Sequence, residues 1–128
     1  MLLKGTGLYC ALSIALTIAL TIVFVSTNQT PAAAYQKCGK ASWYAGPGSK
    51  TASGETLRHG ANTAAHKSLP FGSKVRVTNK RNGRSLIVRI NDRGPYIHGR
   101  IIDLTRGGAQ RLGFINSGVT PVCITRIK

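Results

Sequence analysis

Acidic residues are nearly absent from this chain of 128 residues, which has 18 lysines and arginines but only three carboxyl side chains, Glu55, Asp92 and Asp103. The formal net charge at pH 7 is therefore +15. Such a surplus excludes an acidic surface and directs the protein toward polyanions, which include nucleic acid, an anionic membrane face and an acidic cell-wall polymer. It also leaves three candidates for any chemistry that needs a carboxyl group.

Motifs for metal and nucleotide binding are also lacking. The sequence contains no H-E-x-x-H segment, no pair of C-x-x-C motifs and no glycine-rich phosphate loop after a strand pattern. We therefore expect no metal and no cofactor, and we do not expect nucleotide chemistry.

Charged residues are also scarce in the first 36 residues, where Lys4 is the only charged side chain. Residues 8–25 form a long apolar run, and three alanines follow at 32–34. This pattern predicts an export signal over residues 1–34, cleaved after the alanines. The alternative is an uncleaved membrane anchor, because the run is nearly long enough to span a bilayer. Residues 35–128 then form one small domain.

Cysteine is scarce, with only Cys10, Cys38 and Cys123 in the chain. Cys10 belongs to the expected export signal, and the other two lie near opposite ends of the remaining domain. An even pair in a small exported domain indicates a disulfide, and the alternative is two free thiols. No small-residue lipobox precedes Cys10 or Cys38, so we do not expect a lipoprotein.

Short β-strand patterns, separated by loops with glycine or proline, fill most of the remaining sequence. Asn82-Gly83 predicts a β-hairpin. A helix is expected between Thr105, which can cap its N-terminus, and Gly113, which can end it. Five or six strands with one or two short helices predict a mainly β domain that closes into a compact barrel of unknown strand order. The expected strands are residues 41–44, 74–78, 85–90, 100–104 and 121–127.

Four sequence blocks follow one another with short spacings: "ASWYAGPGSKTASGETL", "NTAAHKSLPFGSKVRVTN", "NGRSLIVRINDRGPY" and "GRIIDLTRGGAQRLG". Together they resemble the rare lipoprotein A (RlpA) family over roughly residues 40 to 126. Four ordered blocks are far more specific than one short motif. The lipobox cysteine and the C-terminal peptidoglycan-binding repeat domain of the full-length family pattern are not found here, which leaves the targeting of the protein open.

The resemblance implies a six-stranded double-psi β-barrel, shared more distantly with expansins and barwin-like proteins. It also implies a periplasmic or cell-wall lytic transglycosylase that acts on peptidoglycan glycan strands, especially strands stripped of stem peptides. Such an enzyme uses the C6 hydroxyl of muramic acid in place of water and leaves a 1,6-anhydro end. We expect a monomer and no nucleic-acid partner.

Asp92 is the first candidate for proton transfer, because breaking a glycosidic bond requires a proton for the departing oxygen. It follows an apolar strand pattern and precedes a turn, where a carboxyl group can be held rigidly. The alternative is a structural role in the bend formed by Arg93-Gly94-Pro95. The family resemblance implies an essential acid at this position.

Glu55 and Asp103 are the other catalytic candidates. Glu55 lies in a loop pattern rich in glycine and serine, and it can equally be a solvated side chain that pairs with a cation. Asp103 has apolar neighbours, so it can be a buried acid with a raised pKa or a structural group before the expected helix.

His66 and two aromatic residues complete the candidate site. His66 can orient a carboxyl group or can be a structural histidine in a turn. Trp43 and Tyr44 can stack on sugars, although one of two neighbouring strand residues must point inward. Arg93 and Tyr96, in the same block as Asp92, are further candidates for substrate binding.

Two rival functions remain at this point. An expansin-like wall-binding or wall-loosening module would use the same groove without breaking bonds. A cationic defence or nucleic-acid-binding protein would depend on the charge alone, and charge does not require the four ordered blocks.

Overall fold

The structure is a computed structural model that describes residues 23, 25–26, 34–44, 46 and 48–128. The expected export signal, residues 1–34, lies almost wholly outside the described residues. Within the described ranges, no helix is both long and apolar enough to cross a membrane. The chain divides into the units Met1–Pro31 and Ala32–Lys128, and the second contains the strands and the helix that the structure describes.

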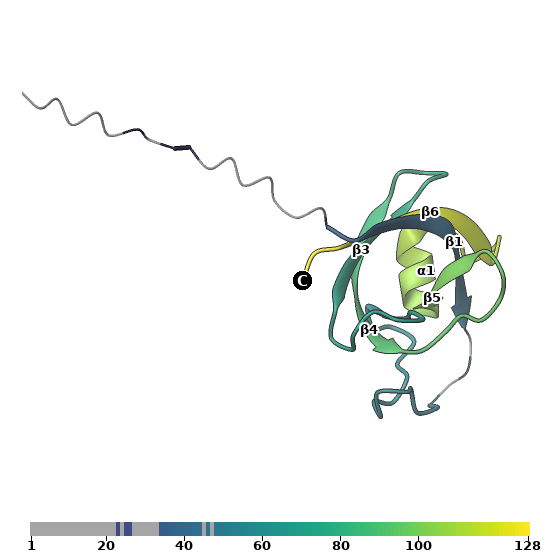
Figure 1. The fold of residues 1–128 in the computed structure, drawn as a ribbon. Coiled ribbons are helices and arrows are strands. Elements are labelled where there is room, and N and C mark those ends of the chain that lie inside the picture. Colours follow the sequence, from purple (N-terminus) through teal and green to yellow (C-terminus); the bar gives the residue numbers. More distant parts are fainter. Residues whose placement is uncertain (1–22, 24, 27–33, 45, 47) are drawn as a thin grey trace, which may run out of the picture. The chain divides into compact units, whose positions relative to one another are not determined.

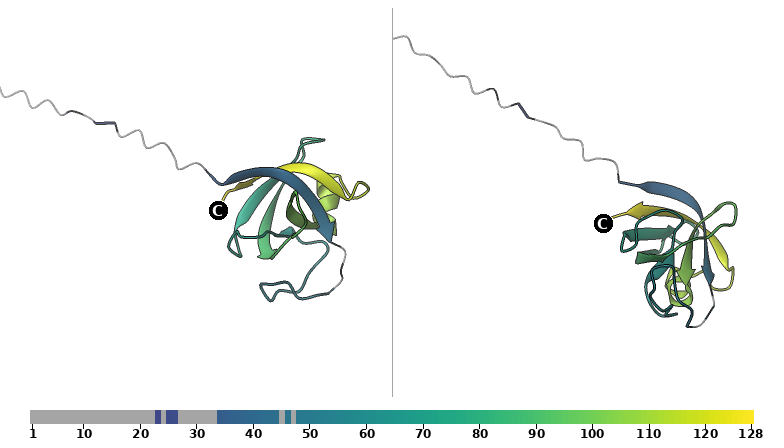
Figure 2. Two further views of the ribbon diagram at one scale, coloured as in Figure 1. Left: turned by 45° about the vertical axis from the view of Figure 1, so that its right-hand side comes forward. Right: turned by 60° about the horizontal axis from the view of Figure 1, so that its bottom comes forward.

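Six strands close into a barrel in the order β1-β5-β2-β4-β3-β6. The pairs β1–β5 and β2–β4 are parallel, and the other neighbours are antiparallel. Closure gives each strand two neighbours, so no edge is left to pair with another chain. Figure 1 looks into the barrel, and Figure 2 shows it from two other sides. The elements are β1 (Gln36–Tyr44), β2 (Thr63–Ala65), β3 (Lys74–Asn79), β4 (Ser85–Asp92), β5 (Arg100–Thr105), α1 (Arg106–Leu112) and β6 (Val119–Arg126).

The mainly β, closed architecture and five of the six strands were predicted from the sequence. β1 begins five residues earlier than predicted, since its polar first half pairs with β6 instead of covering the core. β2 was missed. It has three residues, Thr63–Ala65, too few to show an alternating pattern, and it is a strand because β4 and β5 flank it.

The predicted hairpin and helix are confirmed. Asn82-Gly83 lies in the loop between β3 and β4, where Gly83 has a φ of 74°. Thr105 caps α1 by accepting a hydrogen bond from the N–H of Gly108 (3.0 Å), and Gly113 ends it in the left-handed conformation. Gly107 weakens the helix intrinsically, but a Cβ there would lie 2.6 Å from the carbonyl oxygen of His59. The close approach of that loop therefore requires glycine.

The core lies inside the barrel and is built by alternate strand residues. Helix α1 lies across one open end of the barrel (Figures 1 and 2) and adds Ala109 and Leu112 to the same cluster. Burial of this apolar surface provides the main driving force for folding and fixes which residues of each strand point outward. The fully buried strand residues include Val75, Val77, Val88, Ile90, Ile102, Leu104, Val122 and Ile124.

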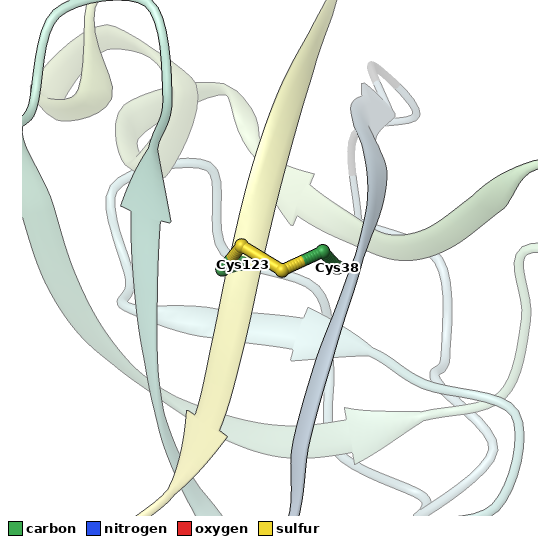
Figure 3. The surroundings of a disulfide bond; sticks show 2 residues. All are labelled: Cys38 and Cys123. Atoms are coloured by element: carbon green, nitrogen blue, oxygen red, sulfur yellow. A yellow bond between two sulfur atoms is a disulfide. The ribbon is translucent and has the colours of Figure 1, made fainter.

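The predicted disulfide joins Cys38 and Cys123 (Figure 3). The two cysteines face each other directly across the antiparallel pair β1–β6. They are 85 residues apart in the sequence, so the bridge ties the first strand of the barrel to the last.

Replacing both cysteines (Cys38→Ala with Cys123→Ala) should lower the free energy of unfolding by about 4 kcal/mol, because the unfolded chain loses a long closed loop. Chemical denaturation of the two proteins checks this value. Wild-type protein unfolded in the presence of a reductant should match the double variant. Equal stability of the oxidised wild type and the variant would contradict the expectation.

Candidate active site

Four residues from four strands form one row across the barrel. Ser42 of β1 pairs with Asp103 of β5, and Asp103 pairs in turn with Ala65 of β2. Ala65 pairs on its other side with Asp92 of β4. Residues that pair across neighbouring strands point to the same face of a sheet, so the four side chains share one face. Ala65 lies between the two aspartates in this row. Their Cα atoms are therefore about 10 Å apart, twice the spacing of neighbouring strands.

This row lies on the outer face of the sheet, where Ser42 and Ala65 are nevertheless buried and the two aspartates are half-buried. The preceding residue of β2, Ala64, pairs with Ile90 and Leu104, and all three are fully buried in the core. The register between β2 and β4 shifts after Ala64, so that Ala65 pairs with Asp92 instead of Asn91. This β-bulge turns Asp92 to the outer face, which simple alternation from Ile90 would not do.

The carboxyl group of Asp92 is half-buried and held by the backbone. Its Oδ1 accepts hydrogen bonds from the N–H of Ala52 (2.8 Å) and of Arg93 (2.9 Å). The contact with Ala52 ties the loop after β1 to the end of β4, and the contact with Arg93 is local to the predicted bend. Oδ2 has no hydrogen bond with a described residue. One oxygen therefore positions the group and the other remains available.

Asp103 is half-buried, and its Oδ1 accepts a hydrogen bond from the hydroxyl of Ser42. Burial raises the pKa of Asp103 most strongly. The Ser42 hydrogen bond and the charge of Arg100 oppose this rise, while the negative charge of Asp92 adds to it. The net result is a raised pKa, so Asp103 keeps its proton to a higher pH than an ordinary aspartate.

Tyr44 lies two residues after Ser42 on β1 and so shares its outward face. Its hydroxyl is buried and has no hydrogen-bond partner among the described residues. Burial raises the pKa of Tyr44, and the nearby charges of Asp92 and Asp103 raise it further. A neutral phenol therefore lies close to both carboxyl groups, where it can donate a hydrogen bond.

Glu55 forms a bidentate ion pair with Arg89 on the outer face of β4, at 2.6 Å and 2.9 Å. The amide of Asn91 also donates to Glu55 (3.3 Å). The hydrogen bonds from Arg89 and then from Asn91 lower the pKa of Glu55 to about 2. Glu55 is therefore a fixed negative charge at neutral pH, as the ion-pair alternative expected, and it has no proton to donate.

His66 is buried, and its imidazole closes a turn. Nδ1 accepts hydrogen bonds from the N–H groups of Ser68 (3.1 Å) and Leu69 (3.0 Å), while Nε2 lies 3.4 Å from the Tyr35 hydroxyl. Burial, followed by the positive charges of Lys37, Arg93 and Lys67, lowers the pKa of His66. The ring is neutral, and its hydrogen bonds to described residues do not include a carboxyl group.

Arg93 stabilises the same turn. Its Nη1 donates to the carbonyl oxygen of Leu69 (2.9 Å), and its guanidinium lies 4.0 Å from the centre of the Phe71 ring. Trp43 points the other way from Tyr44 and packs partly buried against the core. Tyr96 is 77% exposed, so it is free to contact a ligand.

Sequence reasoning missed two residues of this site, Ser42 and Arg89. Ser42 is marked by no motif, and only the pairing of β1 with β5 reveals its contact with Asp103. Arg89 occupies an outward position in a strand pattern, but in a chain with 18 basic residues nothing distinguishes it.

Residues 36–124 match the protein family described as "Lytic transglycolase". The chain belongs to this family. The match covers all six strands apart from the last two residues of β6, and it includes Glu55, Asp92 and Asp103.

Curated relatives of this lytic transglycolase family member confirm the resemblance to RlpA. The chain is 50% identical over 115 residues to the "Probable endolytic peptidoglycan transglycosylase RlpA" of Synechocystis sp., which covers 87% of this chain and 36% of that protein. It is also 50% identical over 103 residues to the "Endolytic peptidoglycan transglycosylase RlpA" of Neisseria meningitidis serogroup A, covering 79% and 43%. The chain thus spans less than half the length of these relatives.

Solved structures confirm the double-psi β-barrel fold. The Streptomyces papain inhibitor superposes with a TM-score of 0.61 at 21% identity, covering 73% of this chain and 96% of the inhibitor. The expansin of Clavibacter michiganensis superposes with a TM-score of 0.59 at 20% identity, covering 73% and 51%.

In this lytic transglycolase family member, Asp103→Asn should raise stability at neutral pH. Asn keeps an oxygen that accepts from Ser42 and removes the charge whose burial is unfavourable. The folded-state pKa of Asp103 is raised. The protonated side chain therefore contributes fully to the free energy of unfolding below the unfolded-state pKa, and this contribution is lost as the pH rises through the folded-state pKa. The variant should melt a few degrees above wild type at neutral pH.

The difference should disappear below about pH 4, where an ordinary aspartate is also protonated. Thermal melts of both proteins across this pH range provide the measurement. A variant that melts below wild type at neutral pH would mean that the ionised carboxylate stabilises the fold.

Proposed function

We propose that the protein is an exported lytic transglycosylase that cleaves peptidoglycan glycan strands, preferably strands without stem peptides, and forms 1,6-anhydro-muramic acid ends. The observation that carries this proposal is the outward row in which Asp92 and Asp103 flank Ala65. The names of the relatives, endolytic peptidoglycan transglycosylases, support this substrate class. Residues 1–34 serve as the export signal, and the domain of residues 35–128 acts as a monomer in the periplasm or cell wall.

The two carboxyl groups divide the proton transfers. Asp103, with its raised pKa, donates a proton to the glycosidic oxygen as the bond from that oxygen to the muramic acid C1 breaks. Asp92 takes the proton of the C6 hydroxyl through Oδ2 as that oxygen bonds to C1. No water is consumed, and the pair ends with its proton on Asp92. The proton then returns to Asp103 before the next turnover.

Neighbouring groups support this chemistry. The Tyr44 hydroxyl, neutral and buried beside the two carboxyl groups, is a hydrogen-bond donor that those groups can use as their charges change. The two backbone N–H groups on Asp92 Oδ1 hold that side chain in place, so it needs no reorganisation during the reaction.

Product analysis tests the proposed function. The full chain is incubated with glycan strands stripped of peptides and with intact sacculi, and the products are identified by mass spectrometry. Anhydro-ended fragments are expected, in larger yield from the stripped strands. Reducing ends would instead indicate hydrolysis, and binding without products would favour the expansin-like alternative.

Asp92→Asn should reduce turnover at least about a hundredfold, the usual scale for losing a general acid or base. The Asn side-chain oxygen can still accept from the N–H groups of Ala52 and Arg93, so the melting temperature and glycan binding should change little. Release of anhydro products, measured beside thermal melts, checks both expectations.

Asp103→Asn is the matched variant, since it should also lose turnover although it gains stability at neutral pH. Loss of activity with a gain in stability separates a catalytic role from a structural one. A folded Asp92→Asn protein with ordinary activity would contradict the assignment of Asp92.

A further inference from the structure

A pocket of about 430 Å³ lies on the outer face of β2 and β4, next to the carboxyl row. Thr63 and Arg89 pair across these strands, as Ala65 and Asp92 do one step further along. That step is two residues on β2, so Thr63 in the wall of the pocket lies about 7 Å along the strand from Ala65 in the carboxyl row. The lining residues are Glu55, Thr56, Arg58, Ala61, Thr63, Arg89 and Asn91.

The charges in this pocket are unbalanced. Glu55 is its only acidic residue, and both of its carboxylate oxygens are bonded to Arg89. Arg58 is exposed, and its guanidinium makes no hydrogen bond or ion pair with a described residue, although its carbonyl oxygen accepts from the N–H of Ala61. The pocket therefore contains two guanidinium groups but one carboxylate. That carboxylate is bound by Arg89, so the N–H donors of Arg58 are left for a ligand. Thr63 and Asn91 add neutral polar atoms of the kind that contact sugars.

We propose that this pocket binds a carboxylate of the glycan substrate and that Arg58 is the residue that recognises it. A guanidinium matches the two oxygens of a carboxylate in a bidentate arrangement, as Arg89 does with Glu55 in the same pocket. The Glu55–Arg89 pair holds the wall of the pocket in place, and Arg58 supplies the unmatched charge.

The carboxylate in question is the lactyl group of muramic acid, an assignment that rests on the proposed function. This group is joined to the sugar ring by a short ether link, so its carboxylate stays within a few bonds of the ring on which Asp92 and Asp103 act. It is an ionised carboxylate only where no stem peptide is attached, because the peptide converts it to a neutral amide. Arg58 would thus favour strands without stem peptides through a charge that other strands lack at this position.

Binding measurements with three probes test the subsite. The probes are peptide-free glycan strands, the same strands with lactyl carboxylates converted to primary amides, and strands that keep their peptides. The full chain carrying Asp92→Asn is used, so that the probes are not consumed. Arg58→Gln should reduce the preference for free over amidated strands about fivefold, the upper range for an exposed charge pair.

Arg81→Gln is the matched control. It removes the same charge from the turn between β3 and β4, which lies at the opposite end of β4 from Asp92, roughly 25 Å away along that strand. This variant should keep the preference of the parent protein. An equal loss in both variants would overturn the subsite in favour of general electrostatic attraction, and no loss in Arg58→Gln would overturn it as well.

Peptide-bearing strands separate the two sources of carboxylate. If Arg58→Gln weakens binding only to strands that keep their peptides, the carboxylate belongs to the peptide and the lactyl assignment is overturned. Because binding is measured without turnover, this result is independent of the product analysis. If the wild-type protein forms no anhydro products, the proposed reaction is wrong. The role of Arg58 in binding is still decided by the measured affinities.

Discussion

The β-bulge near the end of β4 is the constraint on which the candidate site depends. Up to Ile90 the strand alternates regularly between core and exterior, and continued alternation would turn Asp92 inward. The shift in register opposite Ala65 inserts one residue and brings Asp92 to the outer face. Asn91, the extra residue, is used as well: its carbonyl accepts from Ser53 and its amide holds Glu55.

The closed barrel makes this arrangement rigid. Strands β5, β2 and β4 cannot slide past one another without moving Ile102, Leu104, Ala64 and Ile90 out of the core, so the row of outward side chains is held by the packing behind it. β2 contributes only three residues, yet it sets the spacing between the two aspartates. Its small Ala65 puts only a methyl group between them on that face.

The distribution of charge sets these aspartates apart. In a chain with 18 basic side chains, each carboxyl group would readily find a cation. Among the described residues, the Glu55–Arg89 pair is the single ion pair. Asp92 is instead bound by backbone N–H groups and Asp103 by the hydroxyl of Ser42. Carboxyl groups that are held by neutral donors keep an oxygen for a ligand, which a bidentate arginine would occupy.

Local sequence determined much of this protein. The strand patterns, the hairpin at Asn82-Gly83, the capped helix α1 and the partnership of Cys38 with Cys123 all follow from neighbouring residues or from a count, and the structure contains each of them. Ordered motif blocks also indicated the family and its barrel. The carboxyl groups could be proposed as candidates because there are only three of them.

Only the tertiary structure decided how the three carboxyl groups are positioned and which residues they contact. Three-residue β2 has no pattern of its own, and the strand order that places it between β4 and β5 depends on contacts between distant segments. The bulge that turns Asp92 outward, the contact of Ser42 with Asp103 and the pairing of Glu55 with Arg89 all arise from register across strands. Register is set by how whole strands bury their apolar faces, which no single motif encodes.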